Sequence, residues 1–200
     1  MTAFEKLSRV KIVLGSASPR RQNILKTQKL DFEVLTSKGA EESSENDPEA
    51  YVKDIALQKA RDVQRQLVEQ GRWDEKTLLI AADTIVVLDG AIYGKPRDKA
   101  DAKRILENFS GKVHQVLTGL VLVYGNKQRV SCERSTVEFA DLSEEEIEHY
   151  LSFDEYKDKA GAYAIQGLAS VFVKRISGDY YNVVGFPIRK FYEETNQIID

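Results

Sequence analysis

An aspartate inside an apolar run is the first residue that points to chemistry. Asp83 lies in residues 78–88 (LLIAADTIVVL), which are otherwise apolar except for Thr84. A carboxylate in such surroundings loses its hydration unless it meets a cation, a metal ion or hydrogen-bond donors, and groups held in this way are common at functional sites. The alternative is a structural aspartate that turns the chain at a strand end and bonds the Thr84 backbone. The pattern makes Asp83 a candidate catalytic or metal-binding group.

A short loop near the N-terminus has the composition of an anion site. Residues 15–21 (GSASPRR) follow an apolar run and lead into a helical pattern, so Arg20 and Arg21 fall in the first turn of a helix. The helix dipole disfavours cations there by about 0.3–1 kcal/mol, and a bound anion would offset this cost. The first-turn N–H groups, the hydroxyls of Ser16 and Ser18 and both guanidinium groups could converge on a phosphate. In the alternative interpretation, Ser18 is an ordinary N-cap and both arginines are solvated.

Four further polar residues are candidates for the same site. Lys95 follows a hairpin in a Gly-Lys-Pro sequence, where its ammonium could reach back to the preceding strand or remain an ordinary surface charge. Gln166 lies in residues 161–167 (GAYAIQG), where an amide suits either the edge of a base or a structural hydrogen bond. Glu41 and Lys59 are weaker candidates, because one lies in an acidic loop and the stem of the other could simply pack on a helix face.

The hydrophobic pattern predicts the strands and helices that must position these side chains. Apolar runs predict strands at residues 11–14, 32–35, 78–88, 113–124, 129–139, 171–176 and 180–184, with hairpin turns at residues 89–90 and 125–126. Cap residues and periodicity predict helices starting at Pro19, Pro48, Asp98, Ser143 and Pro187, the second of which ends before Gly71. The acidic residues 36–47 predict a surface loop. Strands interleaved with helices indicate an α/β domain.

The composition excludes several classes of partner. With 29 Lys and Arg against 32 Asp and Glu, the net charge is −3, so no general positive field is available for nucleic acid or an anionic membrane. Cys132 has no second cysteine to pair with, which suits a reducing compartment. His114 and His149 lack the spacing of a catalytic dyad. Since no apolar run suits a signal peptide or approaches the ~20 residues of a membrane span, we expect a cytoplasmic protein.

Six ordered segments are similar to those of the Maf family of nucleotide pyrophosphatases. They are LGSASPRR (residues 14–21), AADTIV (81–86), YGKPR (93–97), FSGKVHQVLTG (109–119), DKAGAYAIQG (158–167) and NVVGFP (182–187). The resemblance implies a single domain over residues 1–200, with its core at about 10–195. It also implies a mixed, curved sheet with flanking helices and a cleft between two lobes, related to the inosine triphosphate pyrophosphatases. Members of the family commonly form homodimers.

The resemblance assigns roles to the candidates residue by residue. Asp83 and Lys95 match catalytic positions, while Arg20, Thr84 and Gln166 match positions associated with substrate choice. The GAYAIQG segment resembles the branch that acts on dTTP and UTP, and the branch that acts on 7-methyl-GTP differs there. The resemblance therefore implies a pyrimidine nucleoside triphosphate as substrate, with modified pyrimidine nucleotides or 7-methyl-GTP as the alternatives.

The resemblance also implies a reaction and a divalent cation. Glu41 and Lys59 match acidic and basic active-site positions, although two adjacent glutamates here leave the choice between Glu41 and Glu42 open. The expected reaction is hydrolysis between the α- and β-phosphates, with Mg²⁺ or Mn²⁺ held by Asp83 and Glu41. The residues expected to bind the substrate are Ser16, Ser18, Arg20, Arg21 and Lys59. A nucleotide-sensing regulator of cell division that works without turnover is the alternative from another class.

Overall fold

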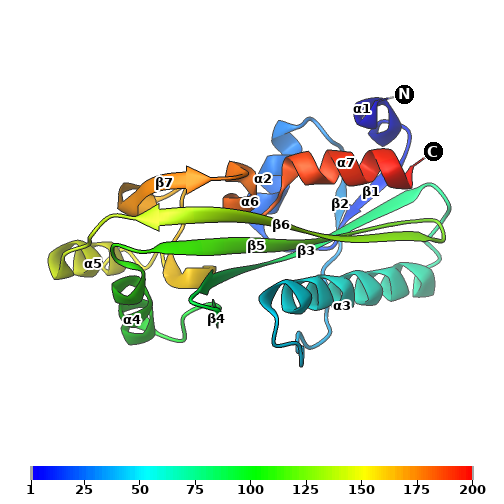
Figure 1. The fold of residues 1–200 in the computed structure, drawn as a ribbon. Coiled ribbons are helices and arrows are strands. Elements are labelled where there is room, and N and C mark those ends of the chain that lie inside the picture. The colour runs from blue at the N-terminus through cyan, green and yellow to red at the C-terminus, as the bar shows by residue number, and fades with distance from the viewer. Residues whose placement is uncertain (1, 200) are drawn as a thin grey trace. The chain divides into compact units, whose positions relative to one another are not determined.

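The computed structural model describes residues 2–199 (Figure 1). Its helices are α1 (Ala3–Leu7), α2 (Pro19–Thr27), α3 (Pro48–Glu69), α4 (Lys99–Phe109), α5 (Glu144–Leu151), α6 (Tyr180–Val184) and α7 (Ile188–Ile198), with 3₁₀ turns η1 (Ala160–Ala162) and η2 (Leu168–Phe172). Its strands are β1 (Lys11–Leu14), β2 (Glu33–Val34), β3 (Thr77–Leu88), β4 (Ala91–Tyr93), β5 (Val113–Tyr124), β6 (Lys127–Phe139) and β7 (Val173–Ser177). Within the described residues these strands form one sheet in the order β2-β1-β3-β5-β6-β7, with β4 paired to β3. The predicted mixed α/β fold is confirmed.

The packing divides the chain into two compact units. The first comprises residues 1–83, 118–133 and 185–200, and the second comprises residues 84–117 and 134–184. The boundaries fall inside β3, β5 and β6, so each of these strands contributes residues to both units. Asp83 closes the first segment of the first unit, and Thr84 opens the second unit.

The core of the first unit lies between α3 and the sheet. β1 runs parallel to both β2 and β3, and in Figure 1 helix α3 covers one face of these strands while α2 and α7 lie on the other. The predicted apolar positions of α3 are all buried: Val52, Ile55, Ala56, Ala60, Val63 and Leu67. Gly119 of β5 lets the helix approach closely, because a Cβ at this position would lie 2.4 Å from the Val52 carbonyl oxygen.

Local sequence signals explain why α3 starts where it does. The Asp47 carboxylate accepts a hydrogen bond from the Ala50 N–H at 2.8 Å, and Pro48 occupies the first helical turn, where its missing N–H costs nothing. The preceding residues 36–47 have no regular secondary structure, as the acidic composition predicts. The helix and the loop before it are therefore encoded by neighbouring residues.

The second unit has an aromatic interior. His114 stacks on Phe109 with ring centroids 4.5 Å apart, and its Nε2 lies 2.9 Å from the Tyr163 hydroxyl. Phe139 packs edge-on against His114, with centroids 4.9 Å apart. Burial lowers the pKa of His114 to about 4, so the imidazole is neutral at physiological pH. This histidine is a structural residue of the core.

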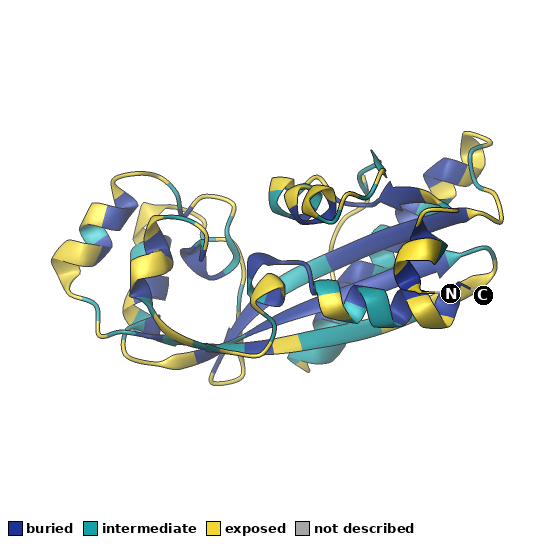
Figure 2. Cartoon of the chain, turned by 90° about the horizontal axis from the view of Figure 1, so that it is seen from above, coloured by how far each residue is buried: buried dark blue, intermediate teal, exposed yellow. Residues whose placement is uncertain are grey.

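Helices α4 and α5 cover this interior and begin as the sequence predicts. The Asp98 side chain caps α4 by accepting from the Asp101 N–H at 2.8 Å. Ser143 and Glu146 form the predicted capping box of α5. In Figure 2 the inner strands are buried along most of their length, whereas the helices alternate between buried and exposed positions. This alternation is that of amphipathic helices on a covered sheet.

The structure corrects three predictions. The strand expected at residues 171–176 begins only at Val173, as β7, because Val171 and Phe172 belong to the 3₁₀ turn η2. Tyr180–Val184 is the short helix α6 and not a strand; Asp179 accepts from the Tyr181 N–H at 2.7 Å through its side chain, which starts the turn. The predicted strand 32–35 is reduced to the two residues of β2. Helix α1, which the periodicity did not predict, has a Thr2/Glu5 capping box. Across the described residues, no helix is long and apolar enough to cross a membrane.

Candidate active site

The glycine-serine loop of residues 15–18 follows β1 directly and stays close to β3. The Gly15 N–H donates to the Ile80 carbonyl at 2.7 Å, and a Cβ on Gly15 would lie 3.2 Å from the same oxygen. Ser18 occupies the N-cap position of α2, but its side chain makes no capping hydrogen bond. The Ser18 hydroxyl therefore does not cap the helix, in contrast to the alternative interpretation in which Ser18 is an ordinary N-cap.

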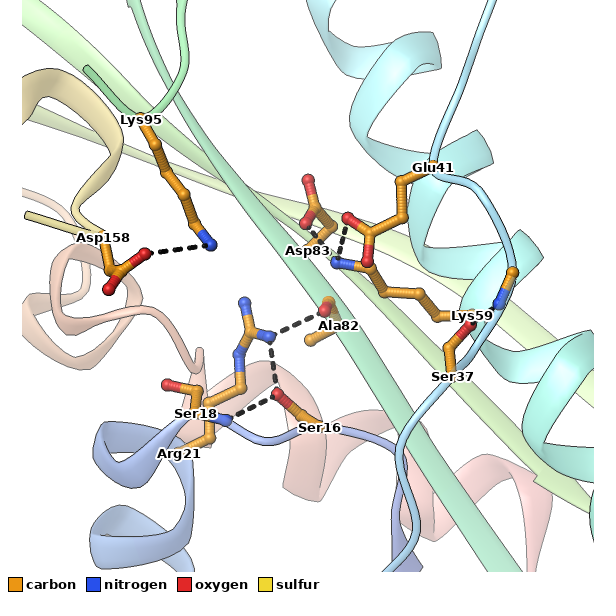
Figure 3. A network of polar contacts seen from close by, with 11 residues as sticks. Ser16, Ser18, Arg21, Ser37, Glu41, Lys59, Ala82, Asp83, Lys95 and Asp158 are labelled. Atoms are coloured by element: carbon orange, nitrogen blue, oxygen red, sulfur yellow. Dashed lines mark hydrogen bonds and ion pairs between the residues drawn. The ribbon is translucent and has the colours of Figure 1, made fainter. Parts of the chain in front are cut away.

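Arg21 is buried inside the first unit, where three neutral oxygens accept hydrogen bonds from its guanidinium group. Nη1 donates to the Ser16 hydroxyl at 3.0 Å and to the Ala82 carbonyl at 2.8 Å (Figure 3). Nε donates to the Gly185 carbonyl at 2.8 Å. Burial lowers the pKa of Arg21, and the nearby negative charge of Asp83 opposes this effect. The arginine links the loop to the residue before Asp83, and it is not solvated. Arg20, by contrast, is only partly buried.

Asp83, Lys59 and Glu41 form a charge cluster in the first unit. The Lys59 ammonium lies 2.7 Å from Oδ1 of Asp83 and 2.9 Å from Oε2 of Glu41 (Figure 3). The side chains of Lys59 and Asp83 are 13% and 17% exposed, so this pair is poorly screened by solvent. Glu41 is half exposed at 50%. The cation that a carboxylate in this strand requires is therefore Lys59, which lies 24 residues earlier in the chain.

The contacts of the acidic loop distinguish its two glutamates. The Glu41 side chain reaches Lys59, whereas Glu42 is held through its backbone carbonyl, which accepts from Gln58 Nε2 at 2.7 Å. The Glu42 side chain is exposed. This geometry favours Glu41 as the acidic partner of Asp83.

Asp62 and Gln66 of α3 bind the start of the same loop, and the sequence did not single them out. The Asp62 carboxylate accepts from the Lys38 N–H at 2.7 Å, and this hydrogen bond is the main reason that the pKa of Asp62 falls to about 2. Gln66 Nε2 donates to the Thr36 carbonyl at 3.1 Å. Polar residues at four-residue spacing usually form a solvated helix face, so the pattern alone could not reveal that both side chains are buried.

The other predicted residues belong to the second unit. Lys95 is exposed and its ammonium lies 3.8 Å from a carboxylate oxygen of Asp158 (Figure 3). The preceding carbonyl, that of Gly94, accepts from the Gly161 N–H at 3.0 Å, so the Lys95 loop contacts the start of the GAYAIQG segment. Gln166 is exposed, and Thr84 is partly buried on β3. The second unit thus brings the Lys95 loop and residues 158–161 together.

The first unit offers carboxylate ligands for a metal ion, but the described residues do not form a complete set of protein ligands. Within residues 2–199 no group of three His, Cys, Asp or Glu side chains is arranged to hold a metal ion. Asp83 and Glu41 nevertheless converge on one ammonium group. Two carboxylates suit Mg²⁺, which is commonly bound by one or two of them together with substrate phosphates and water. The donor set fits a cation that arrives with a phosphate ligand.

Comparisons with known proteins place the chain in a family. A family model described as Maf-like protein matches residues 11–198. The chain belongs to the Maf family. A dTTP/UTP pyrophosphatase of Pyrococcus abyssi is 46% identical over 182 residues, covering 91% of this chain and 93% of the relative. A dTTP/UTP pyrophosphatase of Nitrosospira multiformis is 44% identical over 199 residues, covering 95% and 93%.

A solved structure extends the comparison to the fold. The HAM1 protein from Coxiella burnetii matches this Maf protein with a TM-score of 0.54 at 12% sequence identity, covering 94% of this chain and 99% of that one. At this identity the match concerns the fold alone. It agrees with the mixed sheet and flanking helices seen here.

Proposed function

We propose that this Maf protein hydrolyses dTTP and UTP to the nucleoside monophosphate and pyrophosphate, as a house-cleaning enzyme of the nucleotide pool. Relatives that are 44–46% identical over more than nine-tenths of the chain carry the name dTTP/UTP pyrophosphatase. The structural observation that carries the proposal is the poorly solvated Asp83 carboxylate, held 2.7 Å from Lys59 beside the glycine-serine loop. A structural aspartate at a strand end would not need this cluster.

The chemistry requires positioning and charge neutralisation more than covalent help. The oxygen of a water molecule bonds to the α-phosphorus, the bond from that phosphorus to the bridging oxygen breaks, and pyrophosphate leaves. The water loses a proton, and the pyrophosphate takes up the negative charge of the broken bond. Asp83 orients this water, either as the general base or as a metal ligand, and Lys59 fixes the carboxylate.

Mg²⁺ or Mn²⁺ is part of the proposal. Asp83 and Glu41 would hold the cation, which when bound neutralises phosphate charge and polarises the phosphoryl group. The Lys59 ammonium lies between the same two carboxylates, which limits their mutual repulsion.

The loop of residues 15–18 and the basic side chains supply the phosphate site. We assign direct phosphate contacts to Ser18 and Arg20 of the first unit, and electrostatic support to Arg21. Lys95 of the second unit keeps the catalytic role that the family resemblance implies. Arg21 already donates to three oxygens of the protein, including Ser16 Oγ, so its contribution is to fix the loop and to add buried positive charge near Asp83. This narrows the direct role that the sequence suggested for the second arginine.

Base choice is assigned to Arg20, Thr84 and Gln166. The test measures pyrophosphate release from dTTP, UTP, 7-methyl-GTP and base-modified pyrimidine nucleotides, as kcat/KM, for the wild type and Gln166→Ala. We expect the wild type to favour dTTP and UTP. In the variant, the ratios of kcat/KM between nucleotides with different bases should shrink by about tenfold. An equal loss of rate for every nucleotide would contradict base reading by Gln166. Saturable binding without release from any nucleotide would contradict the proposed activity.

Three further expectations, two from the family resemblance and one from the composition, complete the proposal. We expect residues 1–200 to act as a single functional domain, the protein to be a homodimer, and the cell compartment to be the cytoplasm. The absence of a general positive field argues against a nucleic-acid partner. Light scattering coupled to size exclusion measures the oligomeric state directly; a mass of one chain would contradict the dimer.

A further inference from the structure

A row of polar side chains on α3 contacts the acidic loop that carries Glu41. Gln58, Asp62 and Gln66 are four residues apart, so they lie along one face of the helix, and Lys59 follows the first of them. Asp62 and Gln66 are only 9% and 6% exposed. Burying a charged and a polar side chain on an otherwise apolar helix is costly unless hydrogen bonds compensate for it. The hydrogen-bond partners of Asp62 and Gln66 therefore indicate why these two side chains are buried.

The first anchor lies at the start of the loop. One carboxylate oxygen of Asp62 accepts from the Lys38 N–H at 2.7 Å and from Gln66 Nε2 at 3.0 Å. The same Gln66 nitrogen donates to the Thr36 carbonyl at 3.1 Å, and Arg65 binds the other Asp62 oxygen. Both Asp62 oxygens are therefore occupied, and the backbone of residues 36–38 is bound to the helix.

The second anchor lies just beyond Glu41. Gln58 Nε2 donates to the Glu42 carbonyl at 2.7 Å and to a carboxylate oxygen of Asp54 at 3.0 Å. Between the two anchors the Glu41 carboxylate lies 2.9 Å from the Lys59 ammonium. The glutamate therefore reaches the Asp83 cluster from a segment that is attached to α3 on both sides.

We propose that Asp62 and Gln66 are positioning residues that hold residues 36–42 on α3, so that the Glu41 carboxylate is in place beside Lys59 and Asp83. The catalytic consequence rests on the proposed function. An irregular loop samples many conformations, and fixing each residue costs about 1–2 kcal/mol of conformational entropy. Hydrogen bonds to an ionised group are the strong kind that can offset such a cost. Loss of the anchor would leave Glu41 present in the chain but seldom in place.

The experiment compares Asp62→Ala, Asp62→Asn and Gln66→Leu with the matched control Glu69→Ala. Glu69 lies on the same helix and contacts Arg65, which also binds Asp62; among the ion pairs described for residues 2–199, its partner is Arg65 and not a residue of the loop. Hydrogen exchange measures the protection of the backbone amides of residues 36–42 without nucleotide. Steady-state kinetics with dTTP measure kcat and KM over a Mg²⁺ titration.

Within residues 36–42 we expect Asp62→Ala to speed exchange of the Lys38 amide by about 10-fold to 100-fold, because its hydrogen bond to a charged group is lost. We expect kcat/KM to fall by about tenfold or more, since small misplacements of reacting groups cost this much, and the Mg²⁺ concentration for half-maximal activity to rise. Asp62→Asn, which keeps one acceptor oxygen, should recover part of both losses. Glu69→Ala should match the wild type.

Two results would overturn the proposal. One is unchanged exchange in residues 36–42 of Asp62→Ala; the other is faster exchange with wild-type kinetics and wild-type Mg²⁺ dependence. If Asp62→Ala does not fold, Gln66→Leu provides the same two tests, because it removes the Thr36 contact and leaves the carboxylate. If the wild type releases no pyrophosphate from dTTP, the proposed function fails, and the exchange data alone decide whether Asp62 and Gln66 anchor the loop.

Discussion

The two units hold their candidate residues in different ways. In the first unit, Asp83, Lys59 and Arg21 are at least four-fifths buried, and their side chains make polar contacts of 2.7–3.0 Å with other groups of the protein. In the second unit, the buried interior is aromatic, and Lys95 and Gln166 are exposed on loops. A pre-organised charge cluster pays little reorganisation on meeting a charged ligand, whereas exposed side chains can adapt to different bases. This difference predicts where substitutions should be severe and where they should be selective.

Asp83→Asn should have the largest effect in the molecule. The substitution keeps the shape of the side chain but removes the negative charge that both proposed roles of Asp83 need. We expect kcat for dTTP to fall by about 10³-fold, or ~4 kcal/mol of barrier, with the fold intact by circular dichroism.

Asp89→Asn is the matched control for Asp83. It lies on the exposed hairpin turn with φ 51°, a conformation that asparagine tolerates well. It should keep wild-type kinetics. Wild-type turnover by Asp83→Asn would remove the functional reason for the charge cluster.

Lys59→Met tests whether the cluster needs its central cation. Without the ammonium, the Asp83 and Glu41 carboxylates lose their shared partner, and their orientation is no longer fixed. We expect kcat/KM to fall by about 100-fold, with Lys59→Arg retaining more activity because the charge remains. Lys53→Met removes a lysine from the same helix that pairs only with Glu49 among the ion pairs described, and should be near neutral. Equal effects at both lysines would indicate a general charge effect.

Gly119→Ala tests how tightly the first unit is packed. The added Cβ would lie 2.4 Å from the Val52 carbonyl oxygen and 2.8 Å from its carbon, so β5 and α3 would have to separate. We expect a loss of up to about 3 kcal/mol in the free energy of unfolding. Gly94→Ala, where a Cβ meets nothing within 4 Å, is the control for thermal unfolding. Equal melting temperatures for the two variants would contradict the close contact.

The aromatic interior of the second unit should make stability depend on pH. The pKa of His114 is lowered to about 4 in the folded protein, against ~6.5 when unfolded. As pH falls below 6.5 the unfolded chain takes up a proton that the folded protein does not, so stability falls until about pH 4. The expected loss is ~2 kcal/mol between pH 7.5 and pH 5, measured by urea unfolding. His114→Gln should abolish this slope, and the exposed His149→Gln should keep it.

Asp62 in the first unit should also lose its contribution to stability as the pH falls, but in a lower pH range than His114. Its pKa is depressed to about 2, so its stabilising contribution is present above ~3.8 and is lost as the pH falls toward 2. The two units should therefore respond to acid in separate ranges. A wild-type slope between pH 7.5 and pH 5 in His114→Gln would place the acid-sensitive group elsewhere.

The sequence predicted most elements because their signals are local. Asp47-Pro48 starts α3, and Ser143 with Glu146 starts α5, through contacts within four residues. The strand predicted at Tyr180–Val184 was wrong, because five residues are too few for hydrophobic periodicity to distinguish a strand from a helix. Here the turn is started by Asp179, a contact that the run itself does not contain.

The sequence indicated which residues belong to the site, but not which of them contact one another. Asp83 could be singled out because it interrupts an apolar strand, but its partner Lys59 lies 24 residues away, a distance over which spacing says nothing. Arg21 illustrates the same limit. Its buried charge is stabilised by hydrogen bonds to the Ala82 and Gly185 carbonyls, which lie far from it in the sequence. Likewise, Asp62 is polar on a helix and becomes an anchor only because the loop folds back onto it.

The central claim is water attack at the α-phosphorus, and isotope labelling tests it most directly. The wild-type protein is incubated with dTTP and Mg²⁺ in ¹⁸O-labelled water, and both products are analysed by mass spectrometry. The account predicts dTMP and pyrophosphate, with one ¹⁸O atom in dTMP and none in pyrophosphate. Label in the pyrophosphate, or release of inorganic phosphate with dTDP, would contradict it.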